Sequence, residues 1–578
     1  MSKLVLLALT LSVLHTGTAG EGCLVISIEN EWTGNYNAQF SITTTVPFQG
    51  LTILITFDNP VDTLDYWQGH VESTDSTHFT LTNPELIAEA NDLIEFDIHV
   101  QYTGNKPIAV AVIMNEEDVC DGTGAWTTHP PLENPCLPTG MTPYDYSQVL
   151  CMSYLFYEAQ RSGPLPATQR ITWRGDSALD DGRDVGLDLT GGYYDAGDHV
   201  KFGFPMAFTA TMLAWGIIDF ADGYEAAGQT ENALEAVRWA TDYFLKAYPE
   251  ATEFYGQVGA GAPDHSFWGR PEEMTMERPA MKIDASAPGS ELAAETAAAL
   301  AVASIAFKEV DSSYSSQLLT VAEDLYDFAD KYRGLYHDSI TDAGSFYRSW
   351  SGYGDELCWA ALWLNRATGD SGYLQKAQDA WDEFELGGDV TQFSWDDKSA
   401  GAFALGSMLD PTNSQYKTAL NTFLTFLKND AKYTPDGLVF LDMWGANRHA
   451  ANVAFIALWE AKYGDSAEAA DNRAWATGQI GQLLGEGSRS YVVGYGANPP
   501  ERPHHRSSSC PWPPAACTTN WAQMQPGPNP HVLYGALVGG PGEDGSYEDD
   551  RMDYVHNEVA CDYNAAFSGA LAAMVELS

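Results

Sequence analysis

The chain has 578 residues, a length that predicts two or three domains rather than one core. It carries 79 acidic and 29 basic residues, and the formal charge of -50 at pH 7 opposes binding to nucleic-acid phosphates and anionic membrane surfaces. With 45% apolar residues the composition is that of a folded globular protein. Nucleic acid is therefore excluded as an expected partner, whereas an uncharged substrate is compatible with this surface.

Residues 1–20 have the features of a secretory signal peptide: Lys3, an apolar run over 4–14 and small residues at 17–20. The mature chain is then expected to begin near Glu21. No later stretch offers the roughly 18 uninterrupted apolar residues of a membrane span. We therefore expect a secreted, extracellular monomer with no membrane partner.

Residues 21–121 contain short apolar stretches, near 24–28, 39–45, 51–57, 78–81 and 94–101, that alternate with turn residues. This pattern predicts an antiparallel β-sandwich of about 100 residues. Residues 122–143 are rich in proline and lack an amphipathic period, which predicts a linker.

From residue 144 to residue 578 the pattern becomes helical. Amphipathic segments lie near 144–160, 206–226, 230–247, 290–308, 314–332, 355–368, 371–384, 398–409, 414–428, 447–462, 470–485 and 560–577. Twelve helices favour a double ring. The long segments 161–205, 249–289 and 486–559 between them are candidates for a loop-built cleft, because long ordered loops usually carry function.

Three carboxylates lie in or beside these long segments: Asp195, Asp198 and Glu558. Hydrolysis of a glycosidic bond needs a protonated carboxyl group for the leaving oxygen and an ionised one to activate water on the opposite face of the ring. Asp195 and Asp198 are spaced i, i+3 on a glycine-containing turn, so both can face one water molecule. Taken alone, the turn is also consistent with a merely polar loop, and Glu558 with a charge partner of a helix N-terminus.

Four motifs together are more specific: residues 157–163 (YEAQRSG), 195–198 (DAGD), 490–506 ending PHHR, and 547–565, which includes Asp549, Tyr554, Glu558 and Asn564. In this order they resemble glycoside hydrolase family 9, the mostly endo-acting inverting cellulases with an (α/α)6 barrel. The resemblance runs from about Tyr144 to Ser578. It implies an endo-β-1,4-glucanase acting on cellulose, with Asp198 as the general base, Asp195 helping to orient the water and Glu558 as the general acid.

The same resemblance implies substrate contacts. His504 and Arg506 match positions at the cleavage point, and the matching subsite residues are Tyr347, Trp350, Trp444, His265, Trp268 and Tyr563. Aromatic residues of helical domains also fill cores, so that alternative remains for each ring. Two departures from the family pattern concern the outer subsites: no tryptophan lies near position 391, and His449 stands where relatives have tyrosine.

A structural calcium ion is a further implication of the resemblance. Ser351, Gly352, Asp355 and Glu356, followed by Asp396, resemble the family's calcium site and offer the hard oxygen donors that Ca²⁺ prefers. The alternative is that Asp355 and Glu356 cap the helix that begins there.

The first domain resembles carbohydrate-binding module family 2, in which exposed tryptophans lie on cellulose. Trp32 and Trp67 match two of three platform positions, with Glu85 or a neighbour at the third, and a purely structural domain is the alternative. Cys23 and Cys120 match that family's end-to-end disulfide. Cys510 and Cys517 are a second candidate pair, and Cys358 is expected to be a buried free thiol.

Two other functions remain open. A related β-glucanase could prefer lichenan, glucomannan or xylan, and a noncatalytic β-glucan-binding protein would require loss of the carboxylates, all three of which are present.

Overall fold

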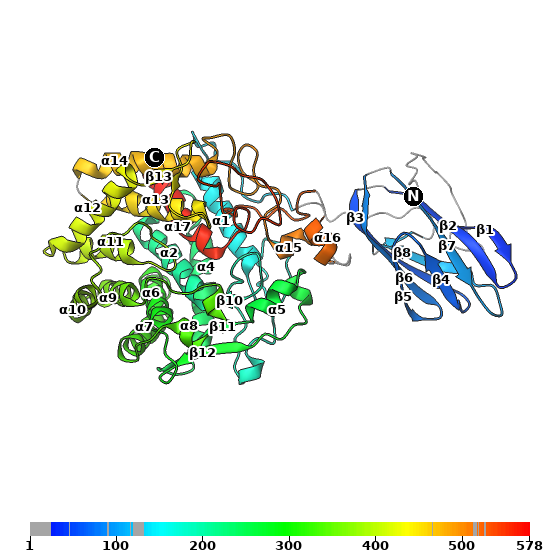
Figure 1. Cartoon of the computed structure of the whole chain (residues 1–578), viewed down its shortest axis with the longest axis horizontal. Coiled ribbons are helices and arrows are strands. Elements are labelled where there is room, and N and C mark those ends of the chain that lie inside the picture. Colours follow the sequence, from blue (N-terminus) through cyan, green and yellow to red (C-terminus); the bar gives the residue numbers. More distant parts are fainter. Residues whose placement is uncertain are drawn as a thin grey trace. The chain divides into compact units, whose positions relative to one another are not determined.

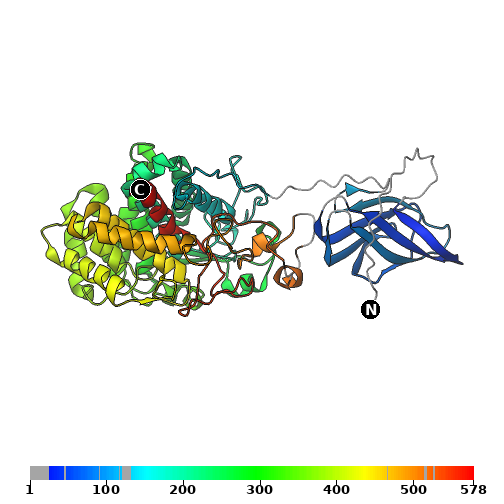
Figure 2. The ribbon, with the colours of Figure 1, turned by 90° about the horizontal axis from the view of Figure 1, so that it is seen from above.

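The computed structural model describes residues 25–44, 47–89, 92–115, 117–119, 132–464, 466–512, 517, 519–524 and 527–577. Two compact units make up the chain: Met1–Pro131 with Cys510–His531, and Leu132–Ser509 with Val532–Ser578. The first holds the blue strands of Figures 1 and 2, and the second holds the large helical array. The predicted signal peptide, the mature start near Glu21 and the Cys23–Cys120 disulfide lie outside the described residues.

The N-terminal unit consists of two antiparallel sheets. The strands are β1 (Ile26–Trp32), β2 (Asn35–Thr43), β3 (Phe48–Phe57), β4 (Thr63–Tyr66), β5 (His70–Asp75), β6 (His78–Ala88), β7 (Leu93–Gln101), β8 (Ala109–Met114) and β9 (Glu117–Asp118). One sheet has the order β1-β2-β7-β4 and the other β5-β6-β3-β8-β9. The predicted antiparallel β architecture is confirmed.

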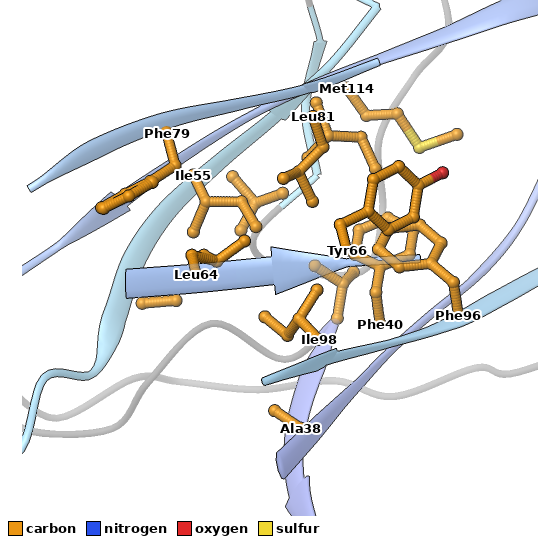
Figure 3. Close-up of a cluster of buried hydrophobic side chains, with 14 of the residues drawn as sticks. Ala38, Phe40, Ile55, Leu64, Tyr66, Phe79, Leu81, Phe96, Ile98 and Met114 are labelled. Carbon is orange, nitrogen blue, oxygen red and sulfur yellow. The ribbon is translucent and has the colours of Figure 1, made fainter. Parts of the chain in front are cut away.

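One core lies between the two sheets, because alternate residues of each strand point inward. Along β2 the buried positions are every second residue, and Phe40 stacks on Phe96 of β7 with ring centroids 4.6 Å apart. Ile55 and Leu81 of the other sheet point into the same cluster (Figure 3). The alternation that predicted strands thus also supplies the apolar contacts that hold the sheets together.

The four-stranded sheet and the turn after its strand β4 carry exposed tryptophan rings. Trp32, at the end of β1, is 47% exposed, and Trp67, directly after β4, is 66% exposed. The Trp32 ring stacks on His99 of β7, with centroids 5.4 Å apart. Glu85 lies on β6 of the five-stranded sheet. Strand pairing therefore places Glu85 on a different sheet from Trp32, and the assignment of Glu85 or a neighbour to the third position stays a prediction.

The second unit is a double ring of helices. The inner ring consists of α2 (Gly203–Asp219), α6 (Ser290–Phe307), α9 (Gly354–Thr368), α11 (Ser399–Leu409), α13 (Ala446–Tyr463) and α17 (Cys561–Leu577). Each inner helix packs against the next, and α17 packs against α2 to close the ring. The outer ring consists of α1 (Tyr146–Gln160), α4 (Thr230–Ala247), α7 (Ser312–Lys331), α10 (Ser371–Phe384), α12 (Ser414–Asn429) and α14 (Ser466–Leu484). The predicted (α/α)6 barrel is confirmed.

Burial differs between the rings as packing requires. Residues 290–304 of α6 are all buried, because an inner helix contacts neighbours on every side, whereas the outer α4 buries one face only. Within the part of the chain that the structure describes, Ser290–Phe307 is also the one helix long and apolar enough to cross a membrane, but 89% of it is buried inside the barrel. It is a core helix of this unit.

Shorter elements complete the unit. The helices are α3 (Ala221–Ala226), α5 (Gly261–Ser266), α8 (Tyr336–Ser339) and α15 (Arg506–Ser509), and the strands are β10 (Lys201–Phe202), β11 (Glu253–Val258), β12 (Ala280–Asp284), β13 (Lys432–Tyr433) and β14 (Val439–Phe440). A further short helix, α16 (Thr519–Met524), belongs to the segment grouped with the first unit. The helix predicted over 206–226 is divided into α2 and α3 at Phe220.

Cysteine pairing matches the expectations in part. The predicted Cys510–Cys517 disulfide is present, and Cys358 is a buried free thiol. The disulfide between Cys136 and Cys151 was not predicted. It joins the end of the predicted linker to helix α1.

Candidate active site

The turn that carries Asp195 and Asp198 follows Gly191 and Gly192 and precedes strand β10. The Asp195 backbone N–H donates to the Val200 carbonyl over 3.0 Å, and the Ala196 N–H lies 3.3 Å from Asp198 Oδ1. A Cβ atom at Gly197 would come within 2.1 Å of the His504 carbonyl oxygen. Only glycine therefore allows this turn to lie against the segment that contains His504.

Backbone hydrogen bonds join two distant segments to this turn. Arg506 N–H donates to the Gly197 carbonyl over 3.0 Å, and Cys561 N–H donates to the Asp195 carbonyl over 2.8 Å. His504 forms a parallel β-bridge with Glu558. Residues 195–198, 504–506 and 558–561 consequently meet at one place, although the first segment lies about 300 residues before the other two in the chain.

The motif of residues 157–163 holds the Asp195–Asp198 turn through Gln160. Gln160, the last residue of α1, donates from Nε2 to the Ala196 carbonyl over 2.7 Å, while its Oε1 lies 2.8 Å from His505 Nε2. One amide side chain thus ties the Asp195–Asp198 turn to the segment 504–506. This contact gives the Tyr157–Gly163 motif a structural role.

Asp198 is held as a carboxylate. It is buried, and its Oδ2 lies 2.9 Å from His265 Nε2. Burial by itself raises the pKa of Asp198, but the hydrogen bond and charge of His265, together with the charge of Arg506, outweigh burial and bring the pKa below its ordinary value. Asp198 therefore stays ionised in acid.

Asp195 has the opposite character. Burial, and then the negative charge of Asp198, raise the pKa of Asp195 well above its ordinary value. Its Oδ2 accepts a short hydrogen bond from the Tyr347 hydroxyl, and among the described residues its Oδ1 has no hydrogen-bond partner. Two neighbouring carboxyl groups in this turn therefore differ in their affinity for a proton, as coupled sites do.

Glu558 holds a proton at neutral pH. Burial, and next the charge of Asp198, raise its pKa to about 8, although Arg506 and His265 act in the other direction. Its backbone carbonyl accepts from Gly539 N–H over 2.9 Å, which fixes the strand-like segment that presents the side chain.

His504 and Arg506 are both buried beside the three carboxylates. His504 Nδ1 lies 2.7 Å from the Arg551 carbonyl, so Nδ1 carries the proton and donates it. Burial, and then the charge of Arg506, lower the pKa of His504 to about 4. The imidazole is therefore neutral, and its Nε2 is a hydrogen-bond acceptor.

The predicted ring residues fall into two groups. Trp350 is 77% exposed and Trp444 is 43% exposed, as faces open to a sugar would be. Trp268 and Tyr563 are buried: Trp268 packs edge-on against His504 and donates to Ser509 Oγ over 2.7 Å. These two rings support the site instead of presenting a free face.

Tyr554 is an exposed ring near the site that was not predicted to contact the substrate. It is 52% exposed, and its centroid lies 5.5 Å from that of Trp444 and 6.0 Å from that of His504. Its place in the motif 547–565 was the available signal.

His449, which replaces the family's tyrosine, is buried next to Arg448 in the first turn of α13. Burial and the Arg448 charge lower its pKa well below the ordinary value, so the ring is neutral.

One half of the candidate calcium site is a turn tied to Asp396. Asp396 Oδ1 accepts from Trp350 N–H over 2.8 Å, and the Ser351 hydroxyl donates to the Asp396 carbonyl over 2.7 Å. The Gly352 carbonyl accepts from Ser349 Oγ over 2.6 Å. The backbone and hydroxyl oxygens of 351–352 are thereby held near Asp396.

The other half lies at the start of α9. Burial, and next the charge of Asp397, raise the pKa of Asp355 to about 6, a repulsion that a dication would offset. The Glu356 carboxylate, in contrast, accepts from Lys398 Nζ over 2.9 Å in the barrel interior. The mutual repulsion of Asp355 and Asp397 is what a calcium ion would offset, whereas the Glu356 side chain is already engaged by Lys398.

Comparison with known proteins agrees with this geometry. The model of glycosyl hydrolase family 9 matches residues 146–571. The chain belongs to this family. Among family 9 proteins, Endoglucanase A of Bacillus pumilus is 49% identical over 449 residues, which cover 76% of this chain and 67% of that protein. Endoglucanase 14 of Arabidopsis thaliana is 45% identical, over 75% of this chain and 94% of that protein.

Solved family 9 structures agree with the fold. The endoglucanase of the termite Nasutitermes takasagoensis has a TM-score of 0.73 and 59% identity, and covers 75% of this chain and 99% of its own. The cellulase Cel9M of C. cellulolyticum, solved with cellobiose, has a TM-score of 0.70 and 37% identity, with the same coverage of both chains. The predicted endoglucanase (cellulase) is confirmed, so the reading as a noncatalytic binding protein is set aside.

Proposed function

We propose that this family 9 enzyme cleaves β-1,4-glucans internally with inversion, with Asp198 as the base, Asp195 as its helper and Glu558 as the acid. The observation that carries the proposal is the set of backbone bonds from Arg506 and Cys561 to the Asp195–Asp198 turn. Together with the bridge between His504 and Glu558, they bring a low-pKa and a high-pKa carboxyl group to one place. An acid and a base of this kind are what inversion requires.

The proposed reaction proceeds in one displacement. Asp198 takes a proton from a water molecule, whose oxygen forms a bond to the anomeric carbon from one face of the sugar. The bond from that carbon to the glycosidic oxygen breaks on the other face, and the oxygen takes the Glu558 proton. Asp195 orients the water: it accepts from Tyr347, and its Oδ1 has no hydrogen-bond partner in the part of the chain that the structure describes. The carboxyl groups of Asp198 and Glu558 should then be about 6.5–9.5 Å apart.

The substrate contacts follow from the groups that line the site. Nε2 of neutral His504 accepts from a sugar hydroxyl. The Arg506 guanidinium beside it is the proposed donor, and its buried Nε and Nη1 have no hydrogen-bond partner among the described residues. The exposed faces of Trp350, Trp444 and Tyr554 pack on glucosyl rings farther along the chain. Lichenan, glucomannan and xylan remain alternative substrates.

The N-terminal unit is proposed to be a carbohydrate-binding module that directs the enzyme to cellulose. The exposed Trp32 and Trp67 support this role. In this proposal residues 1–20 are a signal peptide, 21–121 the module, 122–143 a linker and 144–578 the catalytic domain. The enzyme acts as a secreted monomer, without nucleic-acid or membrane partners.

Calcium is proposed as a structural ion held by oxygens of Ser351, Gly352, Asp355 and Asp396, with Asp397 close by. Its two positive charges would balance these carboxylates and join the turn at 351 to the loop at 396. A chelator should lower the unfolding temperature of the wild type and leave that of Asp355→Asn unchanged.

The test of the function uses wild type, Asp198→Ala and Glu558→Gln on carboxymethylcellulose, lichenan, glucomannan and xylan. Reducing sugar should be released from carboxymethylcellulose by the wild type and not by the variants. Proton NMR of the fresh product should show the α-anomer. The β-anomer would contradict inversion, and release only from another glucan would favour the alternative substrates.

A further inference from the structure

Asp264 is a fourth carboxylate of the site, and the proposed mechanism does not use it. It lies on the short helix α5 directly before His265, and its side chain is 1% exposed. One oxygen of Asp264, one of Asp198 and one ring nitrogen of His265 all lie within 4.8 Å of one another. Among the residues that the structure describes, Asp264 Oδ2 has no hydrogen-bond partner. A buried carboxylate with a free oxygen next to a catalytic base is costly to keep, which suggests that it has a function.

Asp264 contacts one flank of the turn that carries the base directly and is linked to the other flank through Arg506. Its Oδ1 accepts from His199 N–H, one residue beyond Asp198, over 3.1 Å. The same oxygen lies 3.9 Å from Arg506 Nη1, and the Arg506 backbone N–H holds the Gly197 carbonyl, one residue before Asp198. The neighbouring His265 contacts Asp198 itself. Asp264 therefore sits where the turn and the segment 504–506 are joined.

The charges around Asp264 are unequal. Asp198 faces it with a like charge, whereas Arg506 and Arg278 face it with opposite charges, and His265 lies beside it in the chain. Arg278 is already paired with Asp181. Asp264 thus shares the balance of the Arg506 charge with Asp198, and the charge of Arg506 also acts on Glu558.

We propose that Asp264 is a positioning residue of the hydrolysis, which fixes the Asp198 turn through the His199 N–H and balances the charge of Arg506 so that Glu558 keeps its proton. This inference rests on the proposed roles of Asp198 and Glu558. The Asp264 side chain acts in two ways, as a hydrogen-bond acceptor and as a negative charge. Asp264→Asn removes the charge alone, and Asp264→Ala removes both.

The charge acts only where Asp264 is ionised. Burial, and next the charge of Asp198, raise the pKa of Asp264 to about 6. Below that pH the group is neutral, so removing its charge changes nothing. Above it, loss of the negative charge leaves Arg506 balanced by Asp198 alone, so the positive charge acts more strongly on Glu558 and the pKa of Glu558 falls. The acid limb of the pH profile should therefore stay in place while the basic limb moves to lower pH.

The experiment measures kcat and KM for cellopentaose between pH 3 and 10 for the full-length wild type, Asp264→Asn, Asp264→Ala and the control Asp222→Asn, an exposed position on α3. Asparagine still accepts the His199 hydrogen bond but carries no charge. Asp264→Asn should therefore move the basic limb of the profile to lower pH by about half a pH unit or more and leave the acid limb in place. Alanine should also lower kcat by about tenfold or more at every pH, with KM within threefold. The control should match the wild type.

Several results would overturn the inference. One is an Asp264→Asn profile that superimposes on that of the wild type, and another is an equal shift of both limbs. If Asp264→Asn does not fold, as judged by circular dichroism, Asp264→Glu decides: it keeps the charge but displaces the acceptor, so a kcat equal to that of the wild type would count against positioning. Failure of the proposed function is distinguishable, since Asp198→Ala and Glu558→Gln would then keep full activity.

Discussion

Replacing Glu291 with glutamine should make the stability of the enzyme less sensitive to pH. Glu291 is a fully buried residue in the first turn of α6. Its Oε1 accepts from Tyr336 N–H over 2.8 Å, and its Oε2 has no hydrogen-bond partner among the described residues. Burial above all, with a contribution from Asp355, raises its pKa from 4.5 to about 8.

The sign and size of the effect follow from this shift. Between pH 4.5 and 8 the folded protein keeps the Glu291 proton and the unfolded chain loses it, so rising pH favours unfolding. Each pH unit in that window costs about 1.4 kcal/mol, which amounts to about 3 kcal/mol between pH 5 and pH 7.5. Glutamine cannot ionise, and it keeps the acceptor for Tyr336. The stability of Glu291→Gln relative to wild type should therefore grow by about that amount over this range.

The assay is urea unfolding followed by tryptophan fluorescence at pH 5 and pH 7.5. Glu309→Gln, an exposed position just beyond the end of α6, is the matched control and should show no such growth. A stability difference between Glu291→Gln and wild type that is the same at both pH values would refute the reasoning, because a change in packing alone does not depend on pH.

Other predictions concern catalysis and binding. For the wild type, kcat/KM on cellopentaose should fall as the pH rises through about 8, because Glu558 loses its proton there. On the acid side kcat/KM should persist until Asp198 is protonated, below its ordinary pKa of 3.8. A profile that rises through pH 8 would contradict these assignments. Tyr347→Phe removes the hydrogen bond to Asp195, so kcat should fall by about 10- to 100-fold with KM nearly constant, and a loss below twofold would argue against that contact. Trp32→Ala and Trp67→Ala should each weaken retention of the full-length enzyme on insoluble cellulose several-fold without changing cellopentaose hydrolysis, and unchanged retention in both would remove the proposed role of the module.

The sequence predicted the helices of the barrel closely, because inner and outer helices both show a clear period or a continuous apolar run. For α10, predicted and observed bounds coincide at Ser371–Phe384. The residues of the site were predicted from motif spacing, and the fold brings Asp198 and Glu558 together through contacts between backbone segments. The meeting of these segments was predicted from the order of the four motifs together, because no single segment indicates which other segment it contacts.

Side-chain partners were beyond the sequence. Nothing local indicates that Glu356 turns inward to Lys398, or that Asp264 lies against the segment 504–506, because both contacts depend on how distant loops pack. The ring beside Trp32 is His99, which strand pairing supplies from another part of the chain. Glu356 and Asp264 contribute to the charge balance of the site, and His99 contributes to the exposed surface beside Trp32.

The most direct test of the central claim is the hydrolysis of a cellobioside with a strongly activated leaving group, such as 2,4-dinitrophenolate. Such a leaving group needs no proton. Glu558→Gln should therefore lose about 100-fold or more on cellopentaose and stay within about tenfold of wild type on the activated substrate, whereas Asp198→Ala should lose both activities. Equal losses of Glu558→Gln on the two substrates would contradict its role as the acid, and full activity of Asp198→Ala would contradict that of the base.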